Sequence, residues 1–196
     1  MLGEFADAGR HYPILFASGE GNGPIALTGV SDRNVFVKDD QWEEKLYVPG
    51  YVRRYPFALG GVQDDPDRLL LAIDAASDFF VHEGTEGVAL FENGQPSQFT
   101  KEAMTFCETW QRETLNTIEY IKALRAKNLL VGRRVEGTLN DGQKFNVDGF
   151  EIIDVQKLTD LDADTVVAWH RCGWLAASFH HLSSLNRMNE LIVRAT

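Results

Sequence analysis

Histidine and cysteine side chains gather near the C-terminal end of the chain, where they form its densest set of metal-ligand types. The set consists of His170, Cys172, His180 and His181. A zinc or iron site needs ligands that converge on one point, which a helix achieves with pairs spaced i, i+3 or i, i+4. His170 and Cys172 are spaced i, i+2 and the other two are adjacent, so neither pair shares a helix face. We therefore expect no metal and no cofactor, with His180 exposed and His181 a hydrogen-bonded structural histidine.

Cys172 could act as a nucleophile only if a nearby base and a positive environment lowered the pKa of its thiol. His170 is close in sequence but is expected to face elsewhere. The chain contains no GxSxG, HExxH, GxGxxG or Walker-type pattern. Its two cysteines, Cys107 and Cys172, cannot build a disulfide framework, and we expect both to be buried thiols. These observations favour a protein without catalytic residues over an enzyme.

The segment 47–57 combines tyrosines with two adjacent arginines and is the strongest candidate for a binding site. Guanidinium groups grip carboxylates and phosphates, and tyrosine rings offer stacking surface. We predict that a recognition surface is lined by Tyr47, Arg53, Arg54 and Tyr55 and is reached by His181. In the alternative interpretation, the arginines pair with acids such as Asp74 or Asp78 and the tyrosines pack in the core.

Length and charge narrow the classes of function. A chain of 196 residues is long enough for one sizeable core and short for two. Its formal net charge of -10 argues against binding to nucleic acid or to anionic membranes. The sequence contains no long apolar run and no signal-peptide pattern, so we expect no membrane insertion and a cytoplasmic location. Export that needs no N-terminal signal stays open.

The elements that would position these side chains are short strands followed by helices. Strands are expected over residues 11–17, 24–30, 34–37, 57–59, 69–73 and 88–91. Pro49 is expected to open a short helical turn that Pro56 ends. Leu69–Ile73 (LLLAI) has the composition of a buried strand.

A long amphipathic helix is predicted over Phe99–Lys127, with Thr100 as its N-cap and an apolar stripe that includes Cys107 and Trp110. A β-hairpin follows over residues 133–154, with a two-residue turn at Asp141-Gly142 and a bulge at Gly149. Helices are expected after Asp162 and from Trp174 to about Val193, the second with Leu175, Phe179 and Leu182 on its inner face. The prediction is a single α+β domain over residues 1–196, with short antiparallel strands and a β-hairpin packed on one long helix plus a C-terminal helix pair.

The same segments resemble, in order, the SapC family of bacterial proteins. The similarity lies in YPILF (12–16), PIALTG (24–29), NVFV (34–37), YVPGYVRRYPFAL (47–59) and HRCGWLAASFHHLSSLNRM (170–188). Family members usually carry a few dozen more residues before the first motif, so an N-terminal segment is expected to be missing here. The resemblance implies an accessory role near surface-layer or nutrient-uptake systems. It transfers no catalytic residue, because no reaction is established for the family.

The leading hypothesis is therefore a non-enzymatic accessory or binding protein of the SapC type, with an unidentified protein or peptide partner. One alternative is an enzyme, or a partner of an enzyme, acting on an amino acid or peptide. A further alternative is a structural component of a surface layer, which should self-associate. The sequence leaves open whether the protein forms a homo-oligomer.

Overall fold

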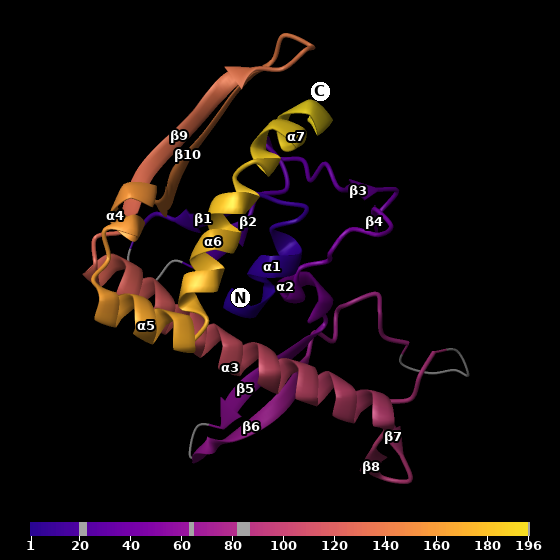
Figure 1. Ribbon diagram of the computed structural model, residues 1–196. Coiled ribbons are helices and arrows are strands. Elements are labelled where there is room, and N and C mark those ends of the chain that lie inside the picture. Colours follow the sequence, from indigo (N-terminus) through magenta and orange to yellow (C-terminus); the bar gives the residue numbers. More distant parts are fainter. Residues whose placement is uncertain (20–22, 63–64, 82–86, 196) are drawn as a thin grey trace. The chain divides into compact units, whose positions relative to one another are not determined.

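The computed structural model describes residues 1–19, 23–62, 65–81 and 87–195 (Figure 1). Its contacts divide the chain into two compact units, residues 1–49 with 116–196 and residues 50–115. Helices and short antiparallel strands occur in both units, which confirms the α+β prediction. The single domain predicted over residues 1–196 stays a prediction. None of the helices in these described ranges is long and apolar enough to cross a membrane.

The first unit contains a four-stranded antiparallel sheet in the order β2-β1-β10-β9. Its elements are η1 (Leu2–Glu4), α1 (Phe5–Ala8), β1 (Ile14–Ala17), β2 (Pro24–Ala26), β3 (Val37–Lys38), β4 (Gln41–Trp42), β9 (Leu130–Thr138), β10 (Lys144–Ile153), α4 (Val155–Thr159), α5 (Ala163–Arg171), α6 (Trp174–Ser184) and α7 (Arg187–Arg194). The C-terminal part of α3 (Gln98–Ala126) also belongs to it. Helix α6 contacts β1, β10, α1 and α5, so it lies at the centre of this unit.

The core of the first unit is aromatic and fully enclosed. Tyr12, Phe16, Phe36 and Tyr120 are at most 2% exposed. Their rings meet at an angle, as in the pair of Tyr12 and Phe36, whose centroids are 4.8 Å apart. Such edge-to-face contacts add stabilisation beyond the burial of area.

The β9–β10 hairpin forms as predicted, but its turn is one residue longer. Leu139 N donates to Gln143 O at 2.8 Å, which leaves three residues between the paired ends. Only the last of them, Gly142, has a positive φ (+84°), the geometry of a turn that ends in a left-handed residue. The predicted bulge is confirmed by a register shift between Val147 and Phe150, where Gly149 has φ +71°.

The C-terminal region differs from the prediction in three ways. The long last helix is two helices, α6 and α7, separated at Leu185 and Asn186. Cys172 is exposed rather than buried, because it caps the end of α5. The buried face of α6 is small and polar, and Phe179, predicted on the inner face, is exposed. That buried face consists of Ala177, Ser178, His181 and Ser184.

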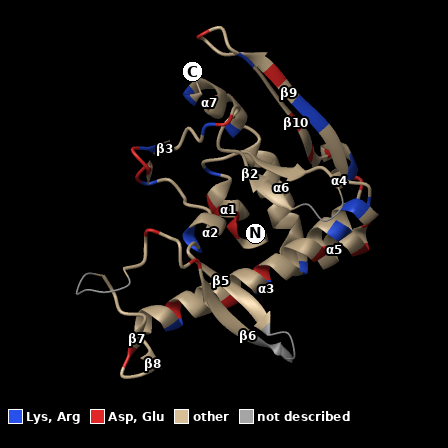
Figure 2. Cartoon of the chain, turned by 180° about the vertical axis from the view of Figure 1, so that it is seen from behind, with Lys and Arg blue, Asp and Glu red and all other residues tan. Residues whose placement is uncertain are grey.

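The second unit contains two ribbons, a short helix and the first part of the long helix. Its elements are α2 (Gly50–Arg53), β5 (Phe57–Val62), β6 (Asp65–Ile73), β7 (Phe91–Glu92), β8 (Gln95–Pro96) and the N-terminal part of α3. β5 pairs only with β6, and β7 only with β8, within the described residues. The long helix is confirmed, but its N-cap is Ser97, whose Oγ accepts from Thr100 N at 3.3 Å. Basic and acidic residues are interspersed along α3 (Figure 2).

Three predicted strands need correction. Residues 69–73 do form a strand, but it is not buried, since Leu70 and Ile73 are exposed. Asn34 Oδ1 accepts from Phe36 N at 2.9 Å and so makes a turn where a strand was expected over 34–37. Of residues 88–91, only Phe91 lies in a strand.

Candidate functional site

The five predicted site residues fall into both units. Tyr47 and His181 belong to the first unit, and Arg53, Arg54 and Tyr55 belong to the second.

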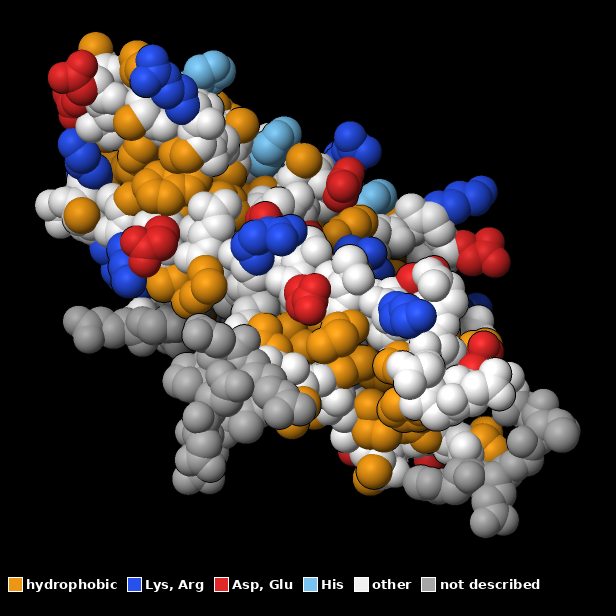
Figure 3. Space-filling model, turned by 90° about the horizontal axis from the view of Figure 1, so that it is seen from below, with side chains coloured by type: hydrophobic (Ala, Val, Ile, Leu, Met, Phe, Trp, Pro, Cys, Tyr) orange, Lys and Arg blue, Asp and Glu red, His pale blue; other side chains and the backbone are white. Residues whose placement is uncertain are grey.

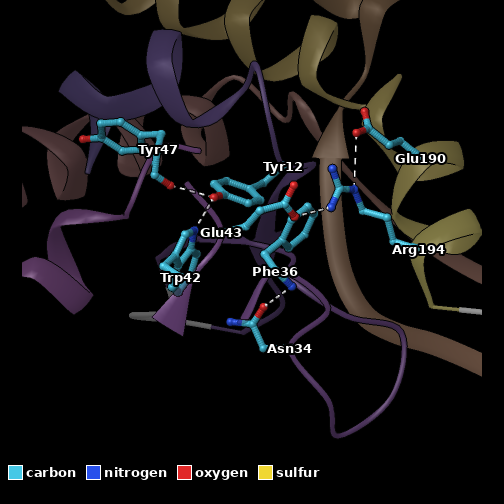
Figure 4. A network of polar contacts seen from close by, with 8 residues as sticks. All are labelled: Tyr12, Asn34, Phe36, Trp42, Glu43, Tyr47, Glu190 and Arg194. Atoms are coloured by element: carbon cyan, nitrogen blue, oxygen red, sulfur yellow. Dashed lines mark hydrogen bonds and ion pairs between the residues drawn. The ribbon is translucent and has the colours of Figure 1, made fainter. Parts of the chain in front are cut away.

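Tyr47 takes part in a hydrogen-bond network inside the first unit (Figure 4). Its hydroxyl donates to Glu4 Oε1 at 2.7 Å, and its carbonyl accepts from the Tyr12 hydroxyl at 2.6 Å. The Tyr12 oxygen in turn accepts from Trp42 Nε1 at 2.8 Å. These bonds join the N-terminal helix to the segment after β4, so Tyr47 has a structural role there.

The same network ends at the surface, where Arg194 lies against the ring of Phe36 at 4.9 Å (Figure 4). Its guanidinium donates to Glu43 at 2.6 Å and to Glu190 at 3.4 Å. The hydrogen bond to Glu43 raises the pKa of Arg194 above its already high value.

His181 is completely buried on α6. Its Nε2 accepts from Ile153 N at 3.1 Å, and its ring centroid lies 4.8 Å from that of Phe16. Because Nε2 is an acceptor, the ring is neutral and carries its proton on Nδ1. Burial lowers the pKa of His181 from 6.5 to about 4, against a smaller opposing effect from the backbone of Ile14. These are the surroundings of a structural histidine.

Arg54 directly follows α2, the helical turn that Pro49 opens. Its guanidinium carbon lies 4.5 Å from the ring centroid of Trp110 and 5.3 Å from that of Tyr51. Stacking between the two rings holds the cation by cation–π attraction. Its Nε is buried and has no hydrogen-bond partner. None of the carboxylates in the described ranges lies within ion-pair distance of this guanidinium.

Arg53 and Tyr55 point to neighbouring groups of the same unit. The Arg53 guanidinium carbon lies 5.2 Å from the ring centroid of Phe106, one helical turn before Trp110 on α3. Tyr55 donates to Asp74 Oδ2 at 3.0 Å, and its ring meets Phe79 at 6.0 Å. Asp74 therefore accepts from a tyrosine, where the alternative interpretation expected an arginine.

These side chains border a groove of about 560 Å³, which we call the arginine groove. It is lined by Arg53, Arg54, Tyr55, Pro56, Phe57, Phe79, Phe99, Glu102, Ala103, Phe106 and Cys107. Three of the predicted residues thus line one concave surface, and every lining residue belongs to the second unit. A cavity of this size is within the range that binds small molecules or peptide side chains.

A second hollow of about 600 Å³ adjoins the first and is more apolar. It is lined by Pro56, Phe57, Phe79, Phe80, Val81, Gly87, Val88, Ala89, Leu90 and Phe99, four of which also line the arginine groove. Phe79 is 76% exposed and Val88 is 68% exposed. Hydrophobic side chains gather on this part of the molecule between the grey segments in Figure 3. Large contiguous apolar surface of this kind marks interaction sites.

The titratable groups of the arginine groove do not make a catalytic set. The thiol of Cys107 has a raised pKa because it is desolvated, and the charge of Arg54 opposes this only in part. A protonated thiol is a poor nucleophile. Glu102 accepts from Gln98 Nε2 at 2.9 Å, and no histidine lines the groove. Across the described ranges, no group of three or more histidine, cysteine or acidic residues converges.

Sequence reasoning missed most of the aromatic lining. The apolar stripe predicted on the long helix includes Cys107 and Trp110, of which only Cys107 lines the groove. The sequence indicates no role for Phe79 or Phe99. The spacing of Phe106 and Trp110 did show that they share a helix face. It could not show that two arginines from another segment lie over that face, because this contact depends on the fold.

The SapC family model matches residues 1–191 of the chain. No curated protein and no solved structure matches it.

Proposed function

The chain belongs to the SapC family, and on that premise we propose that it is a non-enzymatic binding protein whose arginine groove holds an acidic, aromatic peptide segment of a partner. The observation that carries the proposal is Arg54, stacked between Tyr51 and Trp110 with no acceptor for its Nε. A guanidinium held in this way is already oriented, so binding a carboxylate costs it little conformational entropy.

The apolar lining supports a ligand in which an aromatic or large aliphatic side chain lies next to the carboxylate. Phe57 contacts both Phe80 and Phe99 through ring pairs at 5.9 and 5.8 Å, which gives the two hollows a shared aromatic floor. Exposed Phe79 stands beside this floor and is well placed to cover a bound side chain. Aromatic side chains and arginine are the groups most often found at the energetic centres of interfaces.

Charge favours an acidic ligand over a basic one. The chain carries a formal net charge of -10, so its overall electrostatic potential is negative. The two adjacent arginines give the groove a locally positive potential. Such a spot steers an acidic segment towards itself and repels basic ones. Membership of the SapC family supports looking for this partner among cell-surface or nutrient-uptake proteins.

The proposal is tested by fluorescence polarisation with a panel of short synthetic peptides that combine glutamate and phenylalanine. Each has a matched version with glutamine in place of glutamate. The wild-type protein should prefer the acidic version, and Arg54→Glu should weaken its binding by at least about tenfold. Arg54→Lys should have an intermediate effect, since lysine keeps the charge and loses the planar fork.

Arg112→Glu is the matched control, because Arg112 is exposed on α3 and does not line the groove. It makes the same change in charge and should leave peptide binding unchanged. Equal affinity for the glutamate and glutamine versions would contradict the proposal, as would full binding by a folded Arg54→Glu variant. Differential capture from native lysate by wild type and Arg54→Glu then identifies the partner.

A further inference from the structure

A small hollow in the first unit has a polar lining made of side chains that can donate hydrogen bonds. Its volume is about 240 Å³, and it is bordered by α1, α6 and the start of α7 (Figure 1). We call it the cationic hollow, and its polar lining consists of Arg10, His180, Ser183, Asn186 and Arg187. None of the residues that line it is acidic, although acidic residues outnumber basic ones in the chain by 29 to 19.

One side of the cationic hollow is built by α6 and α7. His180, Ser183 and Arg187 are spaced i, i+3 and i+7. Leu185 and Asn186 keep right-handed helical backbone angles across the break between the two helices. The three side chains therefore follow one another along the same side of the helix pair.

The other side is built by the end of α1, which packs closely against α6. A Cβ added at Gly9 would lie 2.6 Å from Phe5 O and 3.2 Å from Ser184 Cβ, so glycine is needed for this approach. Arg10 directly follows Gly9, and its backbone is thus held beside α6. The fold brings two arginines that are far apart in the sequence to one hollow.

Three of the polar side chains make no hydrogen bond to any residue that the structure describes. They are His180, Ser183 and Asn186. Asn186 occupies the N-cap position of α7 but does not cap the helix with its side chain. Asparagine at this position ordinarily accepts from the helix backbone, so its amide here is available to a ligand.

The two arginines have only exposed partners. Arg10 Nη1 lies 3.5 Å from Asp7 Oδ1, and Arg187 Nη1 lies 3.2 Å from Glu190 Oε2. Ion pairs between exposed side chains contribute little to stability, because water competes for both charges. Each guanidinium also has five N–H donors, so it can bind a ligand oxygen while it keeps its present partner.

We propose that the cationic hollow binds a phosphate group, either free or as the monoester of a small molecule. A phosphate carries a charge of about -1.5 to -2 at pH 7 and at least three acceptor oxygens, which two guanidinium groups and three further donors match. A carboxylate has one charge and two oxygens and would leave most of these donors unused. The volume is below the range of about 300–1,000 Å³ that encloses drug-sized ligands, so the hollow holds the phosphate group and little else.

Isothermal titration calorimetry of the full chain with inorganic phosphate tests the proposal, at constant ionic strength in a phosphate-free buffer. The wild-type protein should bind phosphate saturably, and Arg10→Gln and Arg187→Gln should each raise the dissociation constant by at least about tenfold. Both arginines are exposed, so both variants should fold. Arg171→Gln is the matched control and should bind like wild type, because Arg171 is exposed at the end of α5 and does not line the hollow.

Two further ligands identify the chemistry of the site. Acetate should bind at least about tenfold more weakly than phosphate. Methyl phosphate distinguishes the two sources, since binding of both phosphates indicates a monoester and binding of inorganic phosphate alone indicates the free ion. No saturable binding of inorganic phosphate would overturn the proposal, as would equal binding of acetate and phosphate or full phosphate binding by either arginine variant.

The cationic hollow shares no residue with the arginine groove, so the two proposals can be tested separately. Arg54→Glu should leave phosphate binding intact, and Arg187→Gln should leave peptide binding intact. Loss of phosphate binding in Arg54→Glu would assign the phosphate to the arginine groove and would overturn the proposal.

Discussion

The two units of the chain place their aromatic side chains in opposite environments. In the first unit, Tyr12, Phe16, Phe36 and Tyr120 are fully buried and contact one another. In the second unit, Tyr51, Phe79 and Phe91 are mostly exposed, and Cys107 alone among its described hydrophobic side chains is buried. Burial of apolar area, to which aromatic rings contribute much, is the main favourable term in folding, whereas exposed aromatic area is available to a partner. We therefore expect stability to come chiefly from the first unit, whereas the proposed binding site lies in the second.

Phe16→Ala should produce the largest effect on stability. Phe16 is 1% exposed and contacts Phe5, Tyr120 and His181, so the substitution leaves a cavity in the core of the first unit. We expect a loss of about 3–5 kcal/mol in the free energy of unfolding. Chemical denaturation followed by circular dichroism measures it. A loss below about 1 kcal/mol would mean that this core is not the main source of stability.

Acid should destabilise the first unit through His181. The folded protein holds the pKa of His181 at about 4, whereas the unfolded chain has the ordinary value of 6.5. The free energy of unfolding is therefore at its full value above pH 6.5. It decreases progressively as the pH falls towards 4, because the unfolded chain binds a proton that the folded protein excludes. A shift of this size corresponds to about 3 kcal/mol.

Denaturation midpoints measured between pH 7 and pH 4 check this prediction, with His181→Gln giving a flatter profile over that interval. His180→Gln is the control, because His180 is exposed on the same helix and should keep the wild-type profile. Identical profiles for wild type and His181→Gln would show that His181 is not desolvated.

Tyr12→Phe should have a moderate effect. The hydroxyl of Tyr12 accepts from Trp42 Nε1 and donates to the carbonyl of Tyr47, so its removal breaks both hydrogen bonds. We expect a loss of about 1–3 kcal/mol, the usual cost of unsatisfied buried groups. Thermal unfolding by calorimetry measures the change. Tyr51→Phe serves as the control, since Tyr51 is exposed and its hydroxyl should contribute little.

Phe79→Ala should have the smallest effect on stability and a clear effect on binding. With 76% of its surface exposed, Phe79 should change the free energy of unfolding by less than about 0.5 kcal/mol. It lines both hollows of the second unit, so the acidic peptides described above should bind more weakly. Denaturation and polarisation measurements on one sample separate the two effects. A strong loss of stability would show that Phe79 belongs to a core. It would contradict the statement that the aromatic side chains of the second unit contribute little to stability.

Local signals in the sequence predicted the elements well. Asp162 is an N-cap that accepts from Thr165 N, and Gly173 ends α5 with φ +80°, both as their residue types indicate. Gly149 marks the bulge in β10 for the same reason, since glycine tolerates a positive φ. These features depend on a few neighbouring residues, so they can be read without the fold.

Long-range contacts explain what the sequence could not predict. The apolar run 69–73 has the composition of a buried strand, but whether a strand is buried depends on what covers it. The hydrogen-bonded histidine predicted at position 181 is confirmed, but its partner, the backbone N–H of Ile153, is 28 residues away and is set by the fold. The sequence grouped Arg53, Arg54 and Tyr55, which line one groove, and their role in binding stays a prediction. It could not reveal that Tyr47 is engaged by Glu4 and Tyr12.

The stacking of Arg54 on Trp110 has an optical consequence. The chain has four tryptophans, and Trp42, Trp169 and Trp174 lie in the first unit, so Trp110 is the indole of the second. A cation 4.5 Å from an indole ring shifts the energy of its excited state. Any ligand that draws the Arg54 guanidinium away from the ring should therefore change the emission of Trp110 while the other three indoles stay constant. Trp110 would thus be an intrinsic fluorescent reporter of the ligand proposed for the arginine groove.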